Sequence, residues 1–163
     1  PENMKNCAGA AAVIARKAGI FGMVGGQSLD VLLTDKPVNE KEMEFIFNLK
    51  TGALIEAAFM AGAILAGAGK ECVSQLEKAG NLVGVAFQIK DDILDVTSTQ
   101  EVLGKPVFSD EKNNKTTYVT LYGMEKAAAD VENMSEKAES IVKSIGDNEF
   151  LIELINKLIS REK

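Results

Sequence analysis

The chain has 163 residues, of which 46% are hydrophobic, which is enough apolar material for one domain with a buried core. Its net charge of −6 and its pI near 4.8 argue against a nucleic-acid partner, because binding a phosphate backbone requires clustered Lys and Arg side chains. Two cysteines are too few for a disulfide framework and fit a reducing cytoplasm. No long apolar run lacks a charge, and no basic segment precedes an apolar one at the start, so we expect neither a membrane span nor a signal peptide.

Helix formers dominate the sequence, and its β-branched residues never settle into period-two alternation, so we expect an all-α protein. The pattern predicts one broken helix or two over Cys7–Leu33, where glycines recur. A second helix should begin near Asn39, a candidate cap, and continue to about Ala68. A third should cover about Lys70–Val96.

The rest of the chain combines one extended loop with shorter helices. Polar residues, Gly and Pro dominate Thr97–Asn114, which predicts the loop. Gly123 and Gly146 then act as breaks between three expected helices, Thr116–Tyr122, Met124–Ile145 and Asn148–Ser160. Because neither an internal repeat nor a low-complexity linker is evident, we expect residues 1–163 to form a single domain.

Three carboxylates and an amide share one face near the carboxy-terminal end of the third expected helix. At about 100° per residue they fall within an arc of about 100°; they are Gln88, Asp91, Asp92 and Asp95. The opposite face carries an apolar stripe of Leu82, Val85, Ile89, Ile93 and Val96. A helix that is apolar nearly all round is usually buried, and like charges crowded on it repel one another unless a cation neutralises them. Carboxylates in a chain without histidine suit Mg²⁺, or Mn²⁺, better than zinc, while a solvated acidic helix end is the alternative.

A lysine interrupts the apolar stripe of the second expected helix. Lys50 lies within a stripe at three- and four-residue spacing formed by Met43, Ile46, Ala53, Ala57, Ala61 and Ile64. An ammonium group is costly to bury alone, so Lys50 should either pair with a carboxylate or receive a phosphate. Thr51 and Gly52 follow it, so this segment could present a cation and a hydroxyl together. The pattern leaves a structural salt bridge and a ligand role equally open.

The extended loop carries Lys105 and Lys112 just beyond the carboxylate-bearing helix, and Lys115 directly follows the loop. Flexible lysines here could close over a charged ligand, although a solvated polar loop is the more common fate of such charges. Earlier in the chain, glycines recur at helical spacing at Gly19, Gly22 and Gly26, which predicts close packing between two helices.

These residues lie in blocks that resemble the trans-prenyltransferase family of farnesyl and geranylgeranyl diphosphate synthases. The blocks are Gly22–Gln27 with Asp30, Lys50–Leu54, Gly84–Asp95, Leu103–Lys105 and Lys115–Val119. In order and spacing they cover about residues 15–123. Jointly they are far more specific than a lone DDxxD motif, which class I terpene cyclases also use.

The resemblance implies a helical bundle of the isoprenoid synthase type that forms homodimers. It also implies a magnesium-dependent reaction in which an allylic diphosphate condenses with isopentenyl diphosphate to give farnesyl or geranylgeranyl diphosphate. Metal and lysines would neutralise the leaving diphosphate while the double bond of isopentenyl diphosphate attacks the allylic cation.

The same resemblance implies roles for individual residues. Asp91, Asp92 and Asp95 would form the second aspartate-rich motif of the family, with Asp91 the most direct Mg²⁺ ligand. The lysines Lys50, Lys105 and Lys115 would hold the diphosphate. Thr51 and Gln88 would lie near the allylic cation, where their oxygens stabilise positive charge.

Part of the family pattern is missing from this sequence. The family has a first aspartate-rich motif followed by an arginine pair, but Asp91-Asp92 is the one paired aspartate here, and Arg16 and Arg161 lie in no such context. The first residue is proline, and the helical pattern begins at once. We therefore expect the carboxy-terminal half of a synthase, inactive on its own. A non-catalytic helical partner subunit and a class I terpene cyclase are the alternatives, and the Lys50–Leu54 and Leu103–Lys105 blocks disfavour the cyclase.

Overall fold

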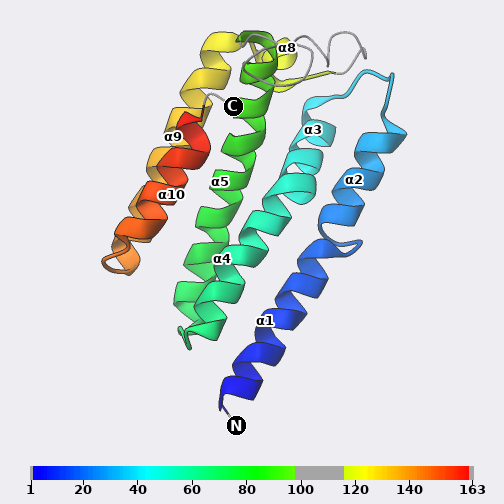
Figure 1. Ribbon diagram of the computed structural model, residues 1–163. Helices are drawn as coiled ribbons and strands as arrows, with labels where there is room; N and C mark the ends of the chain where they lie inside the picture. The colour runs from blue at the N-terminus through cyan, green and yellow to red at the C-terminus, as the bar shows by residue number, and fades with distance from the viewer. Residues whose placement is uncertain (1, 98–115, 162–163) are drawn as a thin grey trace.

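The computed structural model describes residues 2–97 and 116–161, and every regular element within these two ranges is a helix (Figure 1). This confirms the all-α expectation for the described part of the chain. In order, the elements are α1 (Glu2–Ala18), α2 (Met23–Leu32), α3 (Glu40–Ile46), the π-helical segment η1 (Phe47–Gly52), α4 (Ala53–Leu65), α5 (Lys70–Thr97), α8 (Tyr118–Tyr122), α9 (Met124–Ile145) and α10 (Glu149–Ser160).

The long helices lie side by side, with α5 in the middle of the bundle (Figure 1). On one side α5 packs against α4 and η1, which in turn contact α1 and α2. On the other side it packs against α9 and α10. The turn from α2 to α3, the carboxy-terminal end of α5 and the short helix α8 lie together at one end of the bundle. Among the described residues, Gln88, Asp91, Asp92 and Asp95 of the predicted site lie toward the carboxy-terminal end of α5.

The core is held by apolar side chains from α5 and its neighbours. Val83, Val142 and Ile155 are fully buried in one cluster, and Ile89 and Met43 lie in a second cluster nearer to α8. Each such side chain contributes about 1.5–3 kcal/mol when it is removed from water. The position of α5, and of every group it carries, is therefore fixed from both sides.

The expected helix boundaries are largely confirmed. Met124–Ile145 matches at both ends, and the stretch from Cys7 to Leu33 is indeed two helices. Asn39 caps α3 as expected: its side chain accepts a hydrogen bond from the Glu42 backbone N–H at 3.1 Å, and the Glu42 carboxylate accepts one from the Asn39 N–H at 2.9 Å. The predicted loop lies outside the described residues from residue 98 onward, and Thr97 is the last residue of α5.

Two helical stretches, Asn3–Leu32 and Glu40–Leu65, are long and apolar enough to cross a membrane by length and composition. Core helices of soluble bundles and amino-terminal signal sequences meet the same criteria. The second stretch contains residues buried against α5. The expectation of no membrane span therefore stays a prediction.

Candidate functional site

The π-helical segment η1 directs two predicted site residues to different neighbours. It continues α3 into α4 without a break, so the single helix expected here is present but changes its pitch at Phe47–Gly52. A π segment widens the helical turn and rotates the side chains that follow, and such segments recur at functional sites. Lys50 points to α2 and Thr51 to α5.

Two glycines allow α2 and α5 to approach η1 closely. A Cβ added at Gly84 of α5 would lie 2.5 Å from the Cα of Gly52, and one added at Gly26 of α2 would overlap the backbone nitrogen of Lys50. Neither position tolerates a larger residue without moving a helix. The close packing predicted at Gly26 is therefore present, and together with Gly84 it brings both neighbouring helices to the segment that carries Lys50 and Thr51; a Cβ at Gly19 or Gly22 would meet only the backbone at the end of α1, so these two glycines do not serve packing between helices.

Lys50 forms an ion pair with Asp30 of α2, and both side chains are largely buried, at 32% and 15% exposure. The structure thus contains the salt bridge that was one of the two alternatives for Lys50. On the other face, the Thr51 hydroxyl donates a hydrogen bond to the Gln88 side-chain oxygen at 3.0 Å. This bond connects η1 to the carboxylate-bearing end of α5.

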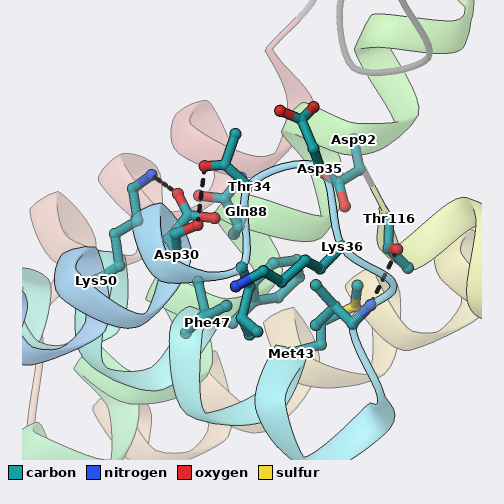
Figure 2. A pocket seen from close by; sticks show the side chains of 13 residues that line it. Asp30, Thr34, Asp35, Lys36, Met43, Phe47, Lys50, Gln88, Asp92 and Thr116 are labelled. Carbon is teal, nitrogen blue, oxygen red and sulfur yellow. Dashed lines mark hydrogen bonds and ion pairs between the residues drawn. The ribbon is translucent and has the colours of Figure 1, made fainter. Parts of the chain in front are cut away.

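A cavity of about 390 Å³ lies at this end of the bundle, between α2, α3, η1 and α5 (Figure 2). Its polar and charged lining consists of Asp30, Thr34, Asp35, Lys36, Lys50, Gln88, Asp92 and Thr116. Its apolar lining consists of Leu33, Val38, Met43, Ile46 and Phe47. Such a cavity suits a ligand with a charged end and an apolar body.

Asp92 and Asp95 are buried, at 6% and 3% exposure, which confirms that this end of α5 carries carboxylates in the protein interior. The Asp92 carboxylate accepts a hydrogen bond from the Tyr118 backbone N–H at 2.7 Å while it also lines the cavity. Asp92 therefore has a structural task, because it fixes the start of α8 against α5.

Asp91 is more exposed, at 42%, and pairs with Arg161, whose Nη2 donates to Asp91 Oδ1 at 2.5 Å. The same Nη2 donates to the Phe87 carbonyl oxygen at 3.1 Å, and the guanidinium lies over the Phe87 ring at 3.4 Å from its centroid. Burial lowers the pKa of Arg161 from its ordinary value and Asp91 opposes this, so the group remains a cation. No sequence signal predicted this pair, because its members are 70 positions apart.

Magnesium fits this donor set at Asp91. Within the described residues, no group of three or more Asp, Glu, Cys or His side chains converges as a ready-made metal site. Mg²⁺, however, is commonly held by one or two carboxylates together with substrate phosphate oxygens. Asp91 is accessible, and it already binds a cation, the Arg161 guanidinium.

The predicted site residues differ in whether they are described and in whether they line the cavity. Lys105 and Lys115 lie outside the described residues. Lys50, Gln88 and Asp92 line one cavity, whereas Thr51, Asp91 and Asp95 are not among its lining residues; Thr51 hydrogen-bonds to Gln88, which is. The cavity also includes charged residues to which the sequence assigned no role, namely Asp30, Asp35 and Lys36.

A hydrogen-bonded trio of Tyr118, Lys126 and Asp130 connects α8 to α9. Asp130 of α9 accepts hydrogen bonds from the Tyr118 hydroxyl and from the Lys126 ammonium, each at 2.6 Å. The bonds from Lys126 and Tyr118 lower the pKa of Asp130 below its ordinary value. Burial, and then Asp130, raise the pKa of Tyr118 far above its ordinary value. Together with the Asp92 bond, this trio attaches α8 to both α5 and α9.

Comparison with known proteins assigns the chain to a family. The model of the polyprenyl synthetase family matches residues 2–155, so this chain belongs to the polyprenyl synthetase family. This agrees with the resemblance seen in the sequence blocks.

Curated relatives support the same assignment. The chain is 40% identical over 129 residues to a geranylgeranyl diphosphate synthase of Cyanophora paradoxa, covering 78% of this chain and 43% of the relative. It is 37% identical over 155 residues to the farnesyl diphosphate synthase of Escherichia coli K12, covering 92% of this chain and 52% of the relative. The chain thus spans about half the length of the curated relatives it matches.

Solved structures show the same helical fold. A geranylgeranyl pyrophosphate synthetase of Pyrococcus horikoshii superimposes with a TM-score of 0.84 at 26% identity, covering 97% of this chain and 60% of that one. A geranyltransferase of Helicobacter pylori, solved with magnesium and isoprenyl diphosphate, superimposes with a TM-score of 0.79 at 28% identity, covering 96% and 52%. The expected isoprenoid synthase type of bundle is confirmed.

Proposed function

We propose that the complete protein containing this chain is a trans-prenyltransferase that condenses an allylic diphosphate with isopentenyl diphosphate. One observation carries the proposal: Lys50, Gln88 and Asp92 line one cavity that is charged on one part of its wall and apolar on another. A prenyl diphosphate has the matching distribution, a polyanion joined to a hydrocarbon. Membership of the polyprenyl synthetase family and the names of the relatives support it.

The reaction breaks the bond between the allylic carbon and the diphosphate oxygen, and the electron pair leaves with the diphosphate. Lys50, together with Lys105 and Lys115, neutralises charge on this leaving group. The double bond of isopentenyl diphosphate donates its electron pair to the allylic carbon, which forms the new carbon–carbon bond. Loss of a proton from the product cation restores a double bond.

We assign Gln88 and Thr51 to the positive charge that develops on the allylic carbon. Gln88 lines the cavity, and its side-chain oxygen accepts the Thr51 hydroxyl hydrogen. This bond fixes the orientation of the Gln88 amide, so that the remaining lone pair of its oxygen can face the cation. Thr51 is thus a positioning residue for Gln88.

The divalent cation, Mg²⁺ or Mn²⁺, would supply charge neutralisation on the leaving diphosphate. We assign this cation first to Asp91, because its carboxylate is accessible. Asp92 and Asp95 are more deeply buried and would support the acidic end of α5. We keep all three as the metal-binding motif of the proposal.

We further propose that the chain acts as the second half of its synthase and is inactive alone. Large apolar side chains are exposed in the turn between α1 and α2 and at the end of α2: Phe21 at 76%, Ile20 at 70% and Leu32 at 65%. The remaining helices of the complete protein would cover them, as the half-length match to the relatives suggests. Residues 1–163 would fold as one domain within a cytoplasmic homodimer, and the product would be farnesyl or geranylgeranyl diphosphate.

The test uses the complete purified protein with isotopically labelled isopentenyl diphosphate, an allylic diphosphate and Mg²⁺. We expect a longer prenyl diphosphate, loss of activity on chelation, and a decrease in kcat/KM of about 100-fold or more for Lys50→Met. The matched control is Lys157→Met, which removes a lysine at 73% exposure in a surface pair with Glu153 and should leave turnover unchanged. Absence of any condensation product would refute the proposed function.

A further inference from the structure

The guanidinium of Arg161 has an unusual set of contacts for a surface arginine. It combines the ion pair with Asp91, the hydrogen bond to the Phe87 carbonyl and the stack over the Phe87 ring, and only 18% of the side chain is exposed. Within the described residues, its buried Nε has no hydrogen-bond partner. The group is thus held mainly by Asp91 and Phe87, and one of its donors is left unused.

Core packing, and not the acidic motif, determines the position of the Arg161 backbone. It follows directly after α10, in an extended conformation with φ −57° and ψ 146°. Ile155 of α10 is fully buried in the cluster with Val83 and Val142, which anchors α10 against α5 and α9. The packing of α10 therefore holds the backbone of residue 161 near the end of α5, whether or not Asp91 binds a cation. Only the side chain needs to move to change partner.

Asp91 is also the residue to which the proposed function assigns the divalent cation, and the inference rests on that function. A guanidinium in contact with one carboxylate oxygen and a divalent cation on the same carboxylate would repel each other at a distance of a few ångström. The exposed fraction of Asp91, 42%, lets a hydrated cation reach it. The two cations therefore compete for one carboxylate.

We propose that Arg161 is the counter-ion of Asp91 in the metal-free protein, and that a divalent cation must displace the guanidinium to bind there. The displaced side chain loses its ion pair but keeps the Phe87 ring and carbonyl within reach. A divalent cation that binds without diphosphate must displace the Arg161 guanidinium with no other ligand to compensate. A cation arriving with a diphosphate gains additional oxygen ligands that offset it, so Arg161 makes metal binding depend on diphosphate.

The experiment measures Mn²⁺ binding to the complete protein by electron paramagnetic resonance, without substrate or diphosphate. The Asp91→Asn variant shows which of the bound Mn²⁺ ions depends on the Asp91 carboxylate. Arg161→Gln removes the positive charge but can still donate to the Phe87 carbonyl, and Arg161→Lys keeps the charge. Both substitutions remove the guanidinium stack over Phe87, but Arg161 lies beyond α10 and neither substitution alters an apolar core side chain; thermal unfolding of each variant checks that the fold is kept.

We expect Arg161→Gln to bind Mn²⁺ at the Asp91 site about fivefold more tightly than the wild type, the scale of one partly exposed ion pair. Arg161→Lys should bind Mn²⁺ with an affinity between those of the wild type and Arg161→Gln, because it keeps the charge but not the planar stack over Phe87. Equal or weaker binding by Arg161→Gln, at a site that Asp91→Asn still abolishes, would overturn the competition and leave the metal site intact. If Asp91→Asn removes no Mn²⁺ from either the wild type or Arg161→Gln, Asp91 is not a ligand, and both this inference and the metal assignment of the proposed function fall.

Discussion

Among the described residues, two lysines pair with carboxylates between neighbouring helices, and they do so in different surroundings. Lys17 of α1 contacts Glu56 of α4 and donates to Glu77 of α5 at 2.7 Å. Lys50 of η1 contacts Asp30 of α2. Lys17 is 20% exposed and Lys50 is 32% exposed. By burial and type of partner the two look alike.

The difference lies in what surrounds each pair. The Glu56 carboxylate also accepts a hydrogen bond from Asn81 at 2.7 Å, and Asn81 donates to Asn48 at 2.8 Å, so the Lys17 network links α1, α4, α5 and η1. Burial alone would lower the pKa of Lys17, but the hydrogen bonds and charges of Glu56 and Glu77 outweigh it and raise that pKa. Lys50 and Asp30, by contrast, line the cavity of about 390 Å³. One pair joins helices, and the other borders the space in which a ligand would lie.

The largest effect on stability should follow from breaking the Lys17 network. In Lys17→Met the Glu56 side chain, at 9% exposure, loses its counter-ion, which should lower the free energy of unfolding by about 3 kcal/mol. Urea denaturation measures this value, and turnover per folded molecule should stay near that of the wild type. The double variant Lys17→Met with Glu56→Gln should recover part of the loss, because no buried charge is left unpaired. An unchanged unfolding midpoint in the single variant would show that the network is not structural.

Gly84→Ala should affect both regions, because Gly84 sets the distance between α5 and η1. The added Cβ would lie 2.5 Å from the Gly52 Cα, so the helices must separate, at a cost of about 2 kcal/mol in unfolding free energy. Turnover should also decrease, because the shift moves Lys50 and Thr51. The control is Gly62→Ala in α4, where a Cβ meets nothing within 4 Å and should stabilise the protein by about 0.5–1 kcal/mol. Equal effects of the two substitutions would contradict the close approach.

Thr51→Val tests the cavity side of the comparison alone. The substitution preserves shape but removes the hydroxyl that orients Gln88, so kcat should decrease about tenfold with little change in KM. Thermal unfolding should change little, since Gln88 retains access to the cavity. A loss of stability without a loss of kcat would place this bond with the structural network instead.

The smallest effect should come from the Asp130 trio, which is neither in the Lys17 network nor in the cavity. Because the Lys126 and Tyr118 bonds lower the pKa of Asp130, they stabilise the fold above the ordinary carboxyl pKa of 3.8, and this contribution is lost as the pH falls below it. Asp130→Asn should therefore cost about 1 kcal/mol at pH 7 and progressively less below pH 3.8. Denaturation of both proteins across this range measures the difference. A cost that does not vary with pH would mean that the charge of Asp130 contributes nothing.

Helical periodicity, glycine breaks and the Asn39 cap predicted the elements well, because these signals are local. Lys50 also stood out locally, as a charge within an apolar stripe, and so did the buried carboxylates of α5. The π segment was not predicted, since nothing in the apolar spacing around it indicates the wider turn.

Contacts between segments far apart in the chain could not be predicted from the sequence either. Asp30 lies 20 positions from Lys50, and Arg161 lies 70 positions from Asp91. Their meeting depends on how whole helices pack. Lys17 was missed for the same reason, because its carboxylate partners come from α4 and α5.

The central claim is that the pair bordering the cavity serves a ligand while the pair within the network serves the fold. Isothermal titration of the complete protein with magnesium diphosphate tests it most directly, with the wild type, Lys50→Met and Lys17→Met compared per folded molecule. We predict that Lys50→Met weakens binding by about 100-fold, whereas Lys17→Met stays within about twofold of the wild type, because Lys17 is not among the residues that line the cavity. Equal losses in the two variants, or wild-type affinity in Lys50→Met, would contradict the account.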